Sequence, residues 1–310
     1  MTPELDSVVD PSRRQRLRGD AVLLVITAVW GITFVVVKDA LDGADPMTFL
    51  ALRFGLGALV AGVAARKALR SSVPWRGGLT LGALLFIGYV FQTFGLAYTT
   101  PSRSAFITGL CVILVPFVST LLFRRWPPVL AVAGAIIALI GTAVLTDAQL
   151  SGPLPLGDLL TLGCAVAYAF HIALTEKFSS RSDPVSLVAL QLAVVAVLST
   201  CTLPLVERRF VPSANLFVAV AITGIIASAL AISLQTWAQT KTTAVRASVI
   251  FALEPVFAIA WGATLGREAL SGHELFGGGL IILGVIVASA APAAVVGGLS
   301  GELAPCKPGP

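Results

Sequence analysis

Residues 249–262, VIFALEPVFAIAWG, form an apolar run that is interrupted near its centre by a glutamate and a proline. An ionisable side chain is costly in a hydrocarbon layer, and proline removes a backbone hydrogen bond from a helix. Glu254 and Pro255 therefore predict an unusual environment, and the rest of the chain indicates what that environment is.

Apolar runs of similar length recur along the whole chain of 310 residues, of which 56% are hydrophobic and 12% charged. Each run has about the 20 residues with which a helix crosses a hydrocarbon core of about 30 Å. We predict an all-α, multi-pass protein of the plasma membrane, the inner membrane of a bacterium, with ten transmembrane helices. The expected spans are residues 21–41, 46–65, 77–98, 103–123, 128–146, 157–177, 184–206, 214–238, 244–265 and 274–295.

Basic residues are distributed unevenly between the loops, and cytoplasmic loops favour Lys and Arg. With both termini inside the cell, fifteen of the 21 Lys and Arg residues fall on the cytoplasmic side and Arg53 falls within a span. The net charge of +5 thus indicates an N-in, C-in topology and gives no sign of nucleic-acid binding. The basic residues expected on the outer side are Lys38, Arg103, Arg208, Arg209 and Arg267.

The two halves of the chain resemble each other. Asp20 and the pair Asp45-Pro46 recur 138 residues later as Asp158 and Asp183-Pro184, each near the start of an apolar run. Because five spans per half is an odd number, the second half enters the membrane from the opposite side, as in the inverted repeats of many secondary transporters. We expect a basic cytoplasmic tail at 1–19, repeats at 20–147 and 156–295, and a disordered cytoplasmic tail at 296–310.

Glu254 lies about 15 Å into its span, which is about half the thickness of the hydrocarbon. A carboxylate at that depth has to face protein or water, and we expect it to carry a proton part of the time. Two interpretations remain open: a group that couples transport to protons or binds a substrate amine, and a neutral glutamic acid that forms a packing hydrogen bond to a neighbouring helix.

Pro255 and its counterpart Pro116 each leave the carbonyl four residues earlier without a helical partner, at Phe251 and Val112. Such carbonyls are tolerated in a membrane where protein or a water-filled cavity satisfies them. We therefore expect helix breaks that line a cavity, although a simple kink at either proline is the alternative.

Other polar or aromatic residues also lie deep within spans. The repeat-related Trp30 and Tyr168 reach the midplane, either as cavity walls for an apolar or cationic substrate or as core packing. Arg53 lies about 10 Å from the outer face; it binds a substrate carboxylate, pairs with an acid such as Asp39, or snorkels to the surface. Gln92 is a candidate for hydrogen bonds in the cavity, and His171 for a proton relay or a packing hydrogen bond.

No motif for ATP hydrolysis or for zinc- or serine-dependent hydrolysis occurs in the sequence. The four cysteines and two histidines lack metal-ligand spacing, so we expect no metal, no cofactor and no enzymatic activity.

Several segments also resemble a known family. They are Trp30-Gly31 with Lys38, Asp45-Pro46 with the following Leu52-Arg53-Phe54, GLAYTTPSRSAFITGLCVILVP at 95–116, LEPVFA at 253–258, LGREAL at 265–270 and the glycines of the last span. Together they resemble the EamA branch of the drug/metabolite transporter (DMT) superfamily over about residues 20–295. The resemblance implies two inverted five-helix repeats, a central cavity built mainly by spans one to four and six to nine, and peripheral spans five and ten. Members mostly move amino acids, other small metabolites, sugars or drugs.

We therefore expect a permease, a secondary transporter or facilitator, that works by alternating access and exports a small organic solute. Protons and membrane lipids are expected as further partners. The alternatives are a lipid-linked sugar or nucleotide-sugar carrier of the same superfamily and an intramembrane lipid-modifying enzyme.

Overall fold

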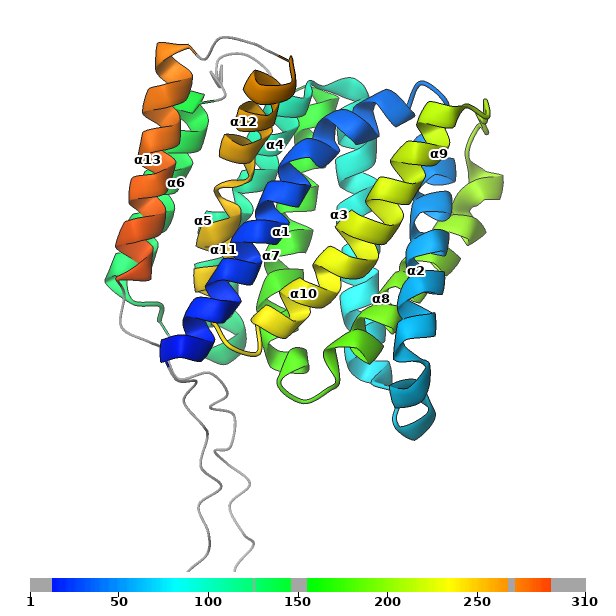
Figure 1. Ribbon diagram of the computed structural model, residues 1–310, viewed down its shortest axis with the longest axis horizontal. Helices are drawn as coiled ribbons and strands as arrows, with labels where there is room; N and C mark the ends of the chain where they lie inside the picture. The colour runs from blue at the N-terminus through cyan, green and yellow to red at the C-terminus, as the bar shows by residue number, and fades with distance from the viewer. Residues whose placement is uncertain (1–12, 125, 146–154, 267–270, 291–310) are drawn as a thin grey trace, which may run out of the picture.

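The protein is described by a computed structural model that covers residues 13–124, 126–145, 155–266 and 271–290. Within these residues all regular secondary structure is helical, apart from an isolated bridge between Ala44 and Phe210. The helices run alongside one another as a bundle (Figure 1). They are α1 (Arg13–Ala40), α2 (Pro46–Ser71), α3 (Trp75–Tyr98), α4 (Pro101–Gly109), α5 (Cys111–Phe123), α6 (Val129–Leu145), α7 (Leu156–Ser179), α8 (Pro184–Thr202), the 3₁₀ turn η1 (Leu203–Leu205), α9 (Ala214–Ala221), the π-helical η2 (Ile222–Leu230), α10 (Ala231–Ala238), α11 (Ala244–Phe251), α12 (Glu254–Gly266) and α13 (Gly272–Ser289).

Nine helical stretches among the described residues are long and apolar enough to cross a membrane. Four of them are built from consecutive helices: α4 with α5, α8 with η1, α9 with η2 and α10, and α11 with α12. The expected fifth span corresponds to α6, an apolar helix of 17 residues that is shorter than the other nine. The protein is thus an all-helical integral membrane protein.

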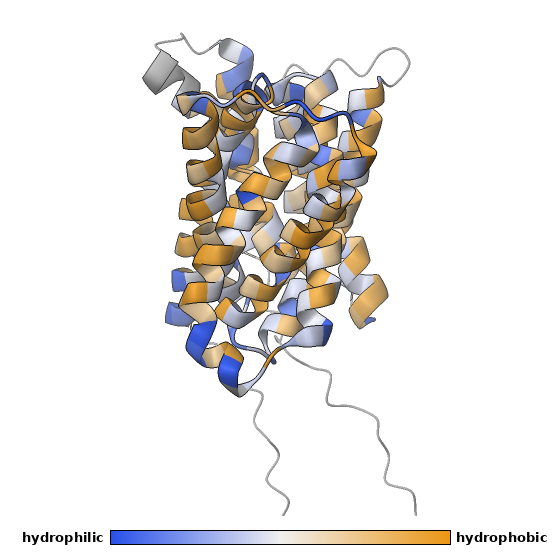
Figure 2. Ribbon diagram, turned by 90° about the vertical axis from the view of Figure 1, so that its right-hand side faces the viewer, coloured by the Kyte–Doolittle hydropathy of each residue, from blue (hydrophilic) through white to orange (hydrophobic). Residues whose placement is uncertain are grey.

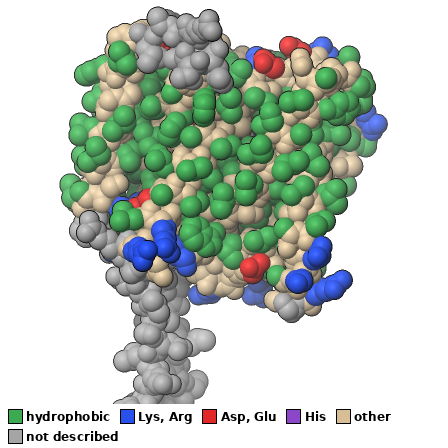
Figure 3. Space-filling view, viewed as in Figure 1, with side chains coloured by type: hydrophobic (Ala, Val, Ile, Leu, Met, Phe, Trp, Pro, Cys, Tyr) green, Lys and Arg blue, Asp and Glu red, His purple; other side chains and the backbone are tan. Residues whose placement is uncertain are grey.

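The sides of the bundle are hydrophobic, as lipid contact requires. Figure 2 shows hydrophobic residues along the middle of the helices and hydrophilic residues toward their ends, and in Figure 3 the middle of the visible face is covered by apolar side chains. Exposed leucine, valine, isoleucine and phenylalanine side chains occur on most of the helices. The start of α1 and the end of α13 lie at the same end of the bundle (Figure 1).

The repeated Asp-Pro pairs start helices in the same way. Asp45 caps α2 by accepting hydrogen bonds from two backbone N–H groups of the first turn, and Asp183 caps α8 by accepting one from Ser186. The proline that follows each aspartate occupies the first helical position, where its missing N–H costs nothing. By contrast, α1 starts at Arg13, inside the expected tail, because Arg, Gln and Leu are good helix formers.

Helices α6 and α13 pack closely together and lie together at one edge of the bundle (Figure 1). Gly134 and Gly141 of α6 face Gly277 and Gly284 of α13, so close that a Cβ on Gly134 would lie 2.4 Å from the Gly284 carbonyl oxygen. The seven-residue glycine spacing thus has a packing role, because small residues let two backbones approach in a membrane.

We predict that Gly134→Val separates α6 from α13 and lowers the stability of the protein by about 1–3 kcal/mol, the usual effect of overpacking. The matched control is Gly279→Val on α13, where a Cβ meets nothing within 4 Å. Thermal unfolding in detergent, followed by tryptophan fluorescence, measures both. Equal unfolding temperatures for the two variants would contradict this packing role.

Candidate functional site

One cavity lies among the helices at the middle of the bundle. Its volume is about 90 Å³, which is room for several water molecules. Its described lining comes from α1 to α5, α7 and α10 to α12, and includes none of α6, α8 and α13. Span seven, which is α8, was expected among the cavity helices and provides no lining residue within the described chain. All six side chains singled out in the sequence line this cavity: Trp30, Arg53, Gln92, Tyr168, His171 and Glu254.

Two of the cavity helices are interrupted near the cavity. The N–H of Leu110, between α4 and α5, and the N–H of Leu253, between α11 and α12, bond to carbonyls three residues back instead of four. The second interruption immediately precedes Glu254 and Pro255, as expected. The first lies six residues before Pro116, which is buried inside α5. A proline alone therefore does not place the first break.

The residues four positions before the prolines, Val112 and Phe251, both line the cavity. The wall of a cavity is a place where backbone carbonyls without helical partners are tolerated, because water or a solute can reach them.

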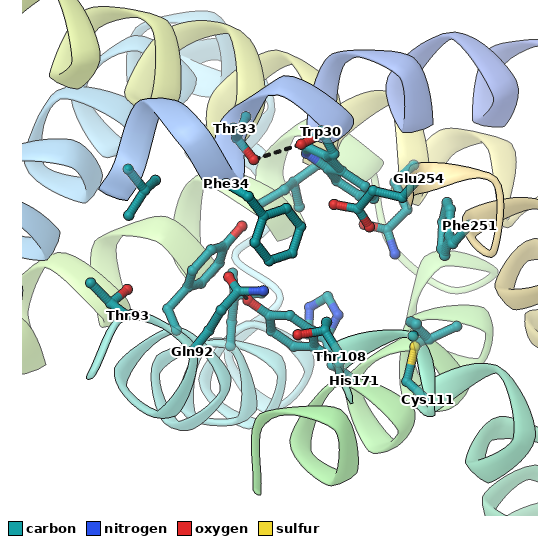
Figure 4. A pocket seen from close by; sticks show the side chains of 18 of the residues that line it. Trp30, Thr33, Phe34, Gln92, Thr93, Thr108, Cys111, His171, Phe251 and Glu254 are labelled. Carbon is teal, nitrogen blue, oxygen red and sulfur yellow. Dashed lines mark hydrogen bonds between the residues drawn. The ribbon is translucent and has the colours of Figure 1, made fainter. Parts of the chain in front are cut away.

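Glu254 is the first residue of α12 and points into the cavity beside Trp30 and Phe251 (Figure 4). It retains some accessible surface. Within the described chain its carboxyl group forms no hydrogen bond and no ion pair. The packing interpretation needs such a bond from a neighbouring helix, and the described residues do not provide one. The contents of the cavity and the positive end of the α12 dipole are therefore what stabilises the charged form of this carboxyl group.

Trp30 is held in place by a bond to an unusual helical segment. Its indole Nε1 donates to the carbonyl of Ala227 at 2.9 Å, and Ala227 belongs to the π-helical η2. Its ring meets Phe251 edge to face, with centroids 5.4 Å apart. Because short π-helical segments are often found at functional sites, η2 is a notable neighbour for a cavity wall.

Tyr168 forms part of the opposite wall. Its hydroxyl donates to Gln92 Oε1 at 3.2 Å, and its ring lies edge to face with Tyr89 at 5.6 Å. Gly88 makes room for this ring, since a Cβ at that position would lie 2.3 Å from a ring carbon of Tyr168.

Arg53 is only 3% exposed, so it does not snorkel to the surface. Its Nε donates to Ser228 Oγ at 3.0 Å and its Nη2 to Tyr89 Oη at 3.2 Å, and its guanidinium lies 4.5 Å from the centre of the Tyr89 ring. The expected pair with Asp39 does not form, because Asp39 is exposed and no acidic side chain of the described chain pairs with Arg53. These two bonds use two of its five N–H groups.

His171 is buried against Gln191 of α8, with 2.9 Å between His171 Nε2 and Gln191 Oε1. Nearby, Gln235 of α10 lines the cavity and donates to Gln239, which in turn donates to the carbonyl of Ile172 at 2.9 Å. His171 thus forms a hydrogen bond of the packing kind and also lines the cavity, and the proton relay remains a prediction.

The sequence interpretation missed several polar residues of the site, among them Tyr89 and Gln235 in the lining and Ser228 beside Arg53. Tyr89 lies three residues before Gln92, a spacing that places both on one face of α3, and this signal was available. Gln235 is a polar side chain in an apolar run, as Gln92 is. Ser228 is one of several serines in the chain, and only the packing of α2 against η2 singles it out.

A comparison with protein families agrees with the membrane fold described above. A family model described as "EamA-like transporter family" matches residues 17–147 and, a second time, residues 155–290. The chain belongs to the EamA-like transporter family. It is therefore a membrane transporter, in agreement with the names of its relatives, which are those of transporters and efflux pumps.

Individual relatives align over most of the chain. An "Uncharacterized transporter" of Archaeoglobus fulgidus is 33% identical over 275 residues, covering 89% of this chain and 87% of the relative. A "Probable amino-acid metabolite efflux pump" of Salmonella typhimurium is 29% identical and covers 87% of this chain and 94% of its own length. A solved crystal structure matches with a TM-score of 0.76 over 90% of this chain and 97% of the other, at 22% identity, and so shares the fold.

We predict that Cys111, which lines the cavity, reacts with a small neutral methanethiosulfonate at least about tenfold faster than Cys164, which is 0% exposed and is absent from the lining. Mass spectrometry of the labelled protein measures both rates, and the variants Cys111→Ser and Cys164→Ser assign the signals. Equal rates at the two cysteines would indicate a dry, filled cavity.

Proposed function

We propose that this EamA-family protein is a secondary transporter or facilitator that exports a small organic solute across the plasma membrane by alternating access. The observation that carries the proposal is Glu254, a carboxyl group that lines a cavity at mid-span and has no hydrogen-bond or ion-pair partner within the described residues. Such a group has to be compensated by water, a proton or a solute, and each of these changes during transport.

We also propose ten spans in two inverted repeats, at 20–147 and 156–295, with both termini inside the cell. Helix contacts that occur in swapped pairs support this arrangement. Helix α1 packs on α10 and α12, and α7 packs on α3 and α5, which are the corresponding helices of the other half. Helix α6, the expected fifth span, would raise the number of spans from nine to ten, and its 17 residues extend about 26 Å. The expected tails lie mostly outside the described residues.

The charges of the cavity favour a solute with charges of both signs. Arg53 offers a cation with no acidic partner in the described part of the chain, and Glu254 offers an anion. Trp30 and Tyr168 provide aromatic walls. An amino acid or a close derivative has this chemistry. The name of the Salmonella relative, an amino-acid metabolite efflux pump, is consistent with such a solute and with export. A nucleotide sugar or lipid-linked sugar would call for several cations around its phosphates, whereas Arg53 is the one Lys or Arg in the described lining.

The test of the proposal is flux in proteoliposomes over a panel of amino acids, amines and sugars, with and without an imposed proton gradient. Solute movement that depends on the protein supports transport, and its dependence on the gradient separates proton coupling from facilitated diffusion. Turnover of a labelled lipid without solute flux would instead favour an intramembrane enzyme.

We predict that Glu254→Gln leaves expression and thermal stability nearly unchanged and abolishes the response of transport to a proton gradient, because the amide cannot exchange a proton. The control is Glu207→Gln, at an exposed loop position. If Glu254→Gln instead destabilises the protein and keeps its specific activity, the packing interpretation of Glu254 is correct.

We predict that Arg53→Met raises the half-saturation concentration of a zwitterionic solute by about tenfold to a hundredfold, the usual effect of losing a charge-assisted hydrogen bond. For the amide of the same solute, which lacks the carboxylate, the half-saturation concentration changes little. Competition of both compounds against a labelled solute measures this. An equal rise in the half-saturation concentrations of the acid and of its amide would mean that Arg53 only supports the fold.

A further inference from the structure

One polar side chain of the cavity has an orientation that its surroundings fix. Gln235 of α10 lines the cavity and is 3% exposed. Its Nε2 donates to Gln239 Oε1 at 3.1 Å, one helical turn further along, and Gln239 Nε2 donates to the Ile172 carbonyl of α7 at 2.9 Å. Gln239 is fully buried and is absent from the described lining. The two amides thus form a chain that starts in the cavity and ends on the backbone of a neighbouring helix.

The end of this chain decides which atom of Gln235 faces the cavity. A backbone carbonyl oxygen can only accept, so Gln239 has to turn its NH₂ group toward Ile172 and its oxygen toward Gln235. That oxygen also only accepts, so Gln235 has to turn its NH₂ group toward Gln239. The amide oxygen of Gln235 remains, and it accepts no hydrogen bond from the residues that the structure describes. Gln235 therefore offers the cavity a hydrogen-bond acceptor.

Gln235 and Glu254 reach the cavity from two helices that both contact α1. Helices α10 and α12 pack against α1, and Figure 1 shows them on opposite sides of it. Neither the Gln235 amide oxygen nor the Glu254 carboxyl group has a hydrogen-bond donor within the described residues. A primary ammonium group carries three N–H donors that point in different directions. Such a group suits a site with two separate acceptors.

The donors of the cavity lie on other helices. Arg53 of α2 uses two of its five N–H groups in the bonds to Ser228 and Tyr89. Gln92 of α3 accepts the Tyr168 hydroxyl with its oxygen, so its NH₂ group is left for the cavity. Figure 4 shows Gln92 and Glu254 on opposite sides of the cavity. These side chains place acceptors on α10 and α12 and donors on α2 and α3, which suits a zwitterion bound in one orientation.

Gln235 differs from Glu254 in what it recognises. The Glu254 carboxylate attracts a cation with or without N–H groups, because charges attract at a distance. A neutral amide oxygen gains most from an N–H that points at it. It also stays an acceptor when Glu254 carries a proton, since an amide does not titrate. Gln235 is therefore suited to distinguish a primary ammonium group from a fully methylated one.

We propose that Gln235 is a specificity-determining residue whose amide oxygen selects solutes with a primary ammonium group, and that Gln239 is the positioning residue that keeps this oxygen turned toward the cavity. The proposal rests on the proposed function and narrows its solute to a carboxylate with a primary amine. A quaternary amine with the same charges fits less well, because methyl groups replace the N–H groups that Gln235 accepts.

The test is equilibrium binding to the purified protein, measured by isothermal titration calorimetry with a panel of the common L-amino acids that carry a primary amine. The amino acid that binds most tightly is compared with its N,N,N-trimethyl betaine, which keeps both charges and has no N–H. Gln235→Met is expected to raise the dissociation constant of the amino acid about tenfold, the effect of losing one hydrogen bond to a charged group, and to leave that of the betaine nearly unchanged. A dissociation constant that rises equally for both would indicate lost packing and would overturn the proposal.

The wild type gives a test that needs no variant. It is expected to bind the amino acid more tightly than the betaine, and equal affinities would overturn the proposal.

Two further glutamine variants separate recognition from positioning. Gln92→Met, on the opposite side of the cavity, is expected to weaken binding of the amino acid and of the betaine alike, because both carry the carboxylate. Gln239→Met is expected to reduce the preference for the amino acid over the betaine, because the Gln235 amide is then free to rotate. Thermal unfolding of each variant checks that the fold is retained. A folded Gln239→Met variant with the preference of the wild type would overturn the positioning role.

Failure of this inference differs from failure of the proposed function. Flux of a solute that lacks an ammonium group, with no amino acid of the panel binding, overturns the role of Gln235 and leaves transport standing. Selective binding of an amino acid without solute flux in proteoliposomes supports the role of Gln235 and overturns the proposed function.

Discussion

A carboxyl group in a hydrocarbon layer requires water, a proton or a polar partner, and the structure around Glu254 is arranged by that requirement. The helix is interrupted just before it, so that Glu254 starts α12 with the positive end of a helix dipole close by. The neighbouring helices leave a cavity at this depth and offer the carboxyl group no bond within the described chain. Beyond the α12 dipole, we therefore propose that water, a proton or a solute compensates the carboxyl group, and this is the physical basis of the proposed transport site.

The walls of the cavity are kept in place by contacts outside it. The π-helical η2 accepts two hydrogen bonds from these walls: the Ala227 carbonyl accepts from the Trp30 indole, and the Ser228 hydroxyl oxygen accepts from Arg53. Gly31 brings α1 against the Glu254 backbone, where a Cβ would lie 3.0 Å from its carbonyl oxygen. Among the residues that the structure describes, the guanidinium has no acidic partner and the carboxyl group has no hydrogen-bond donor. Arg53 and Glu254 line one cavity and form no ion pair with each other, so their opposite charges suit a solute that carries both a negative and a positive charge.

Much of this arrangement follows from the sequence, since it depends on local pattern. Apolar length predicts the spans, the Asp-Pro pairs predict two helix starts, and counting residues from the ends of the spans places six polar or aromatic side chains at cavity depth. The parts that were not predictable depend on tertiary contacts. The break at Leu110, away from Pro116, and the π-helical η2 are set by packing between helices, and the Ser228 partner of Arg53 follows from the contact of α2 with η2.

The central claim is that the Glu254 carboxyl group faces water in a cavity. Infrared difference spectroscopy of the purified protein in lipid tests it most directly, by following the carboxyl C=O stretch that is absent in Glu254→Gln. The account predicts a band that appears on acidification, shifts within seconds of a change from H₂O to D₂O, and moves when a transported solute binds. A Glu254 band that is indifferent to pH, to D₂O and to solute would show a carboxyl group sealed in protein, and would contradict the account.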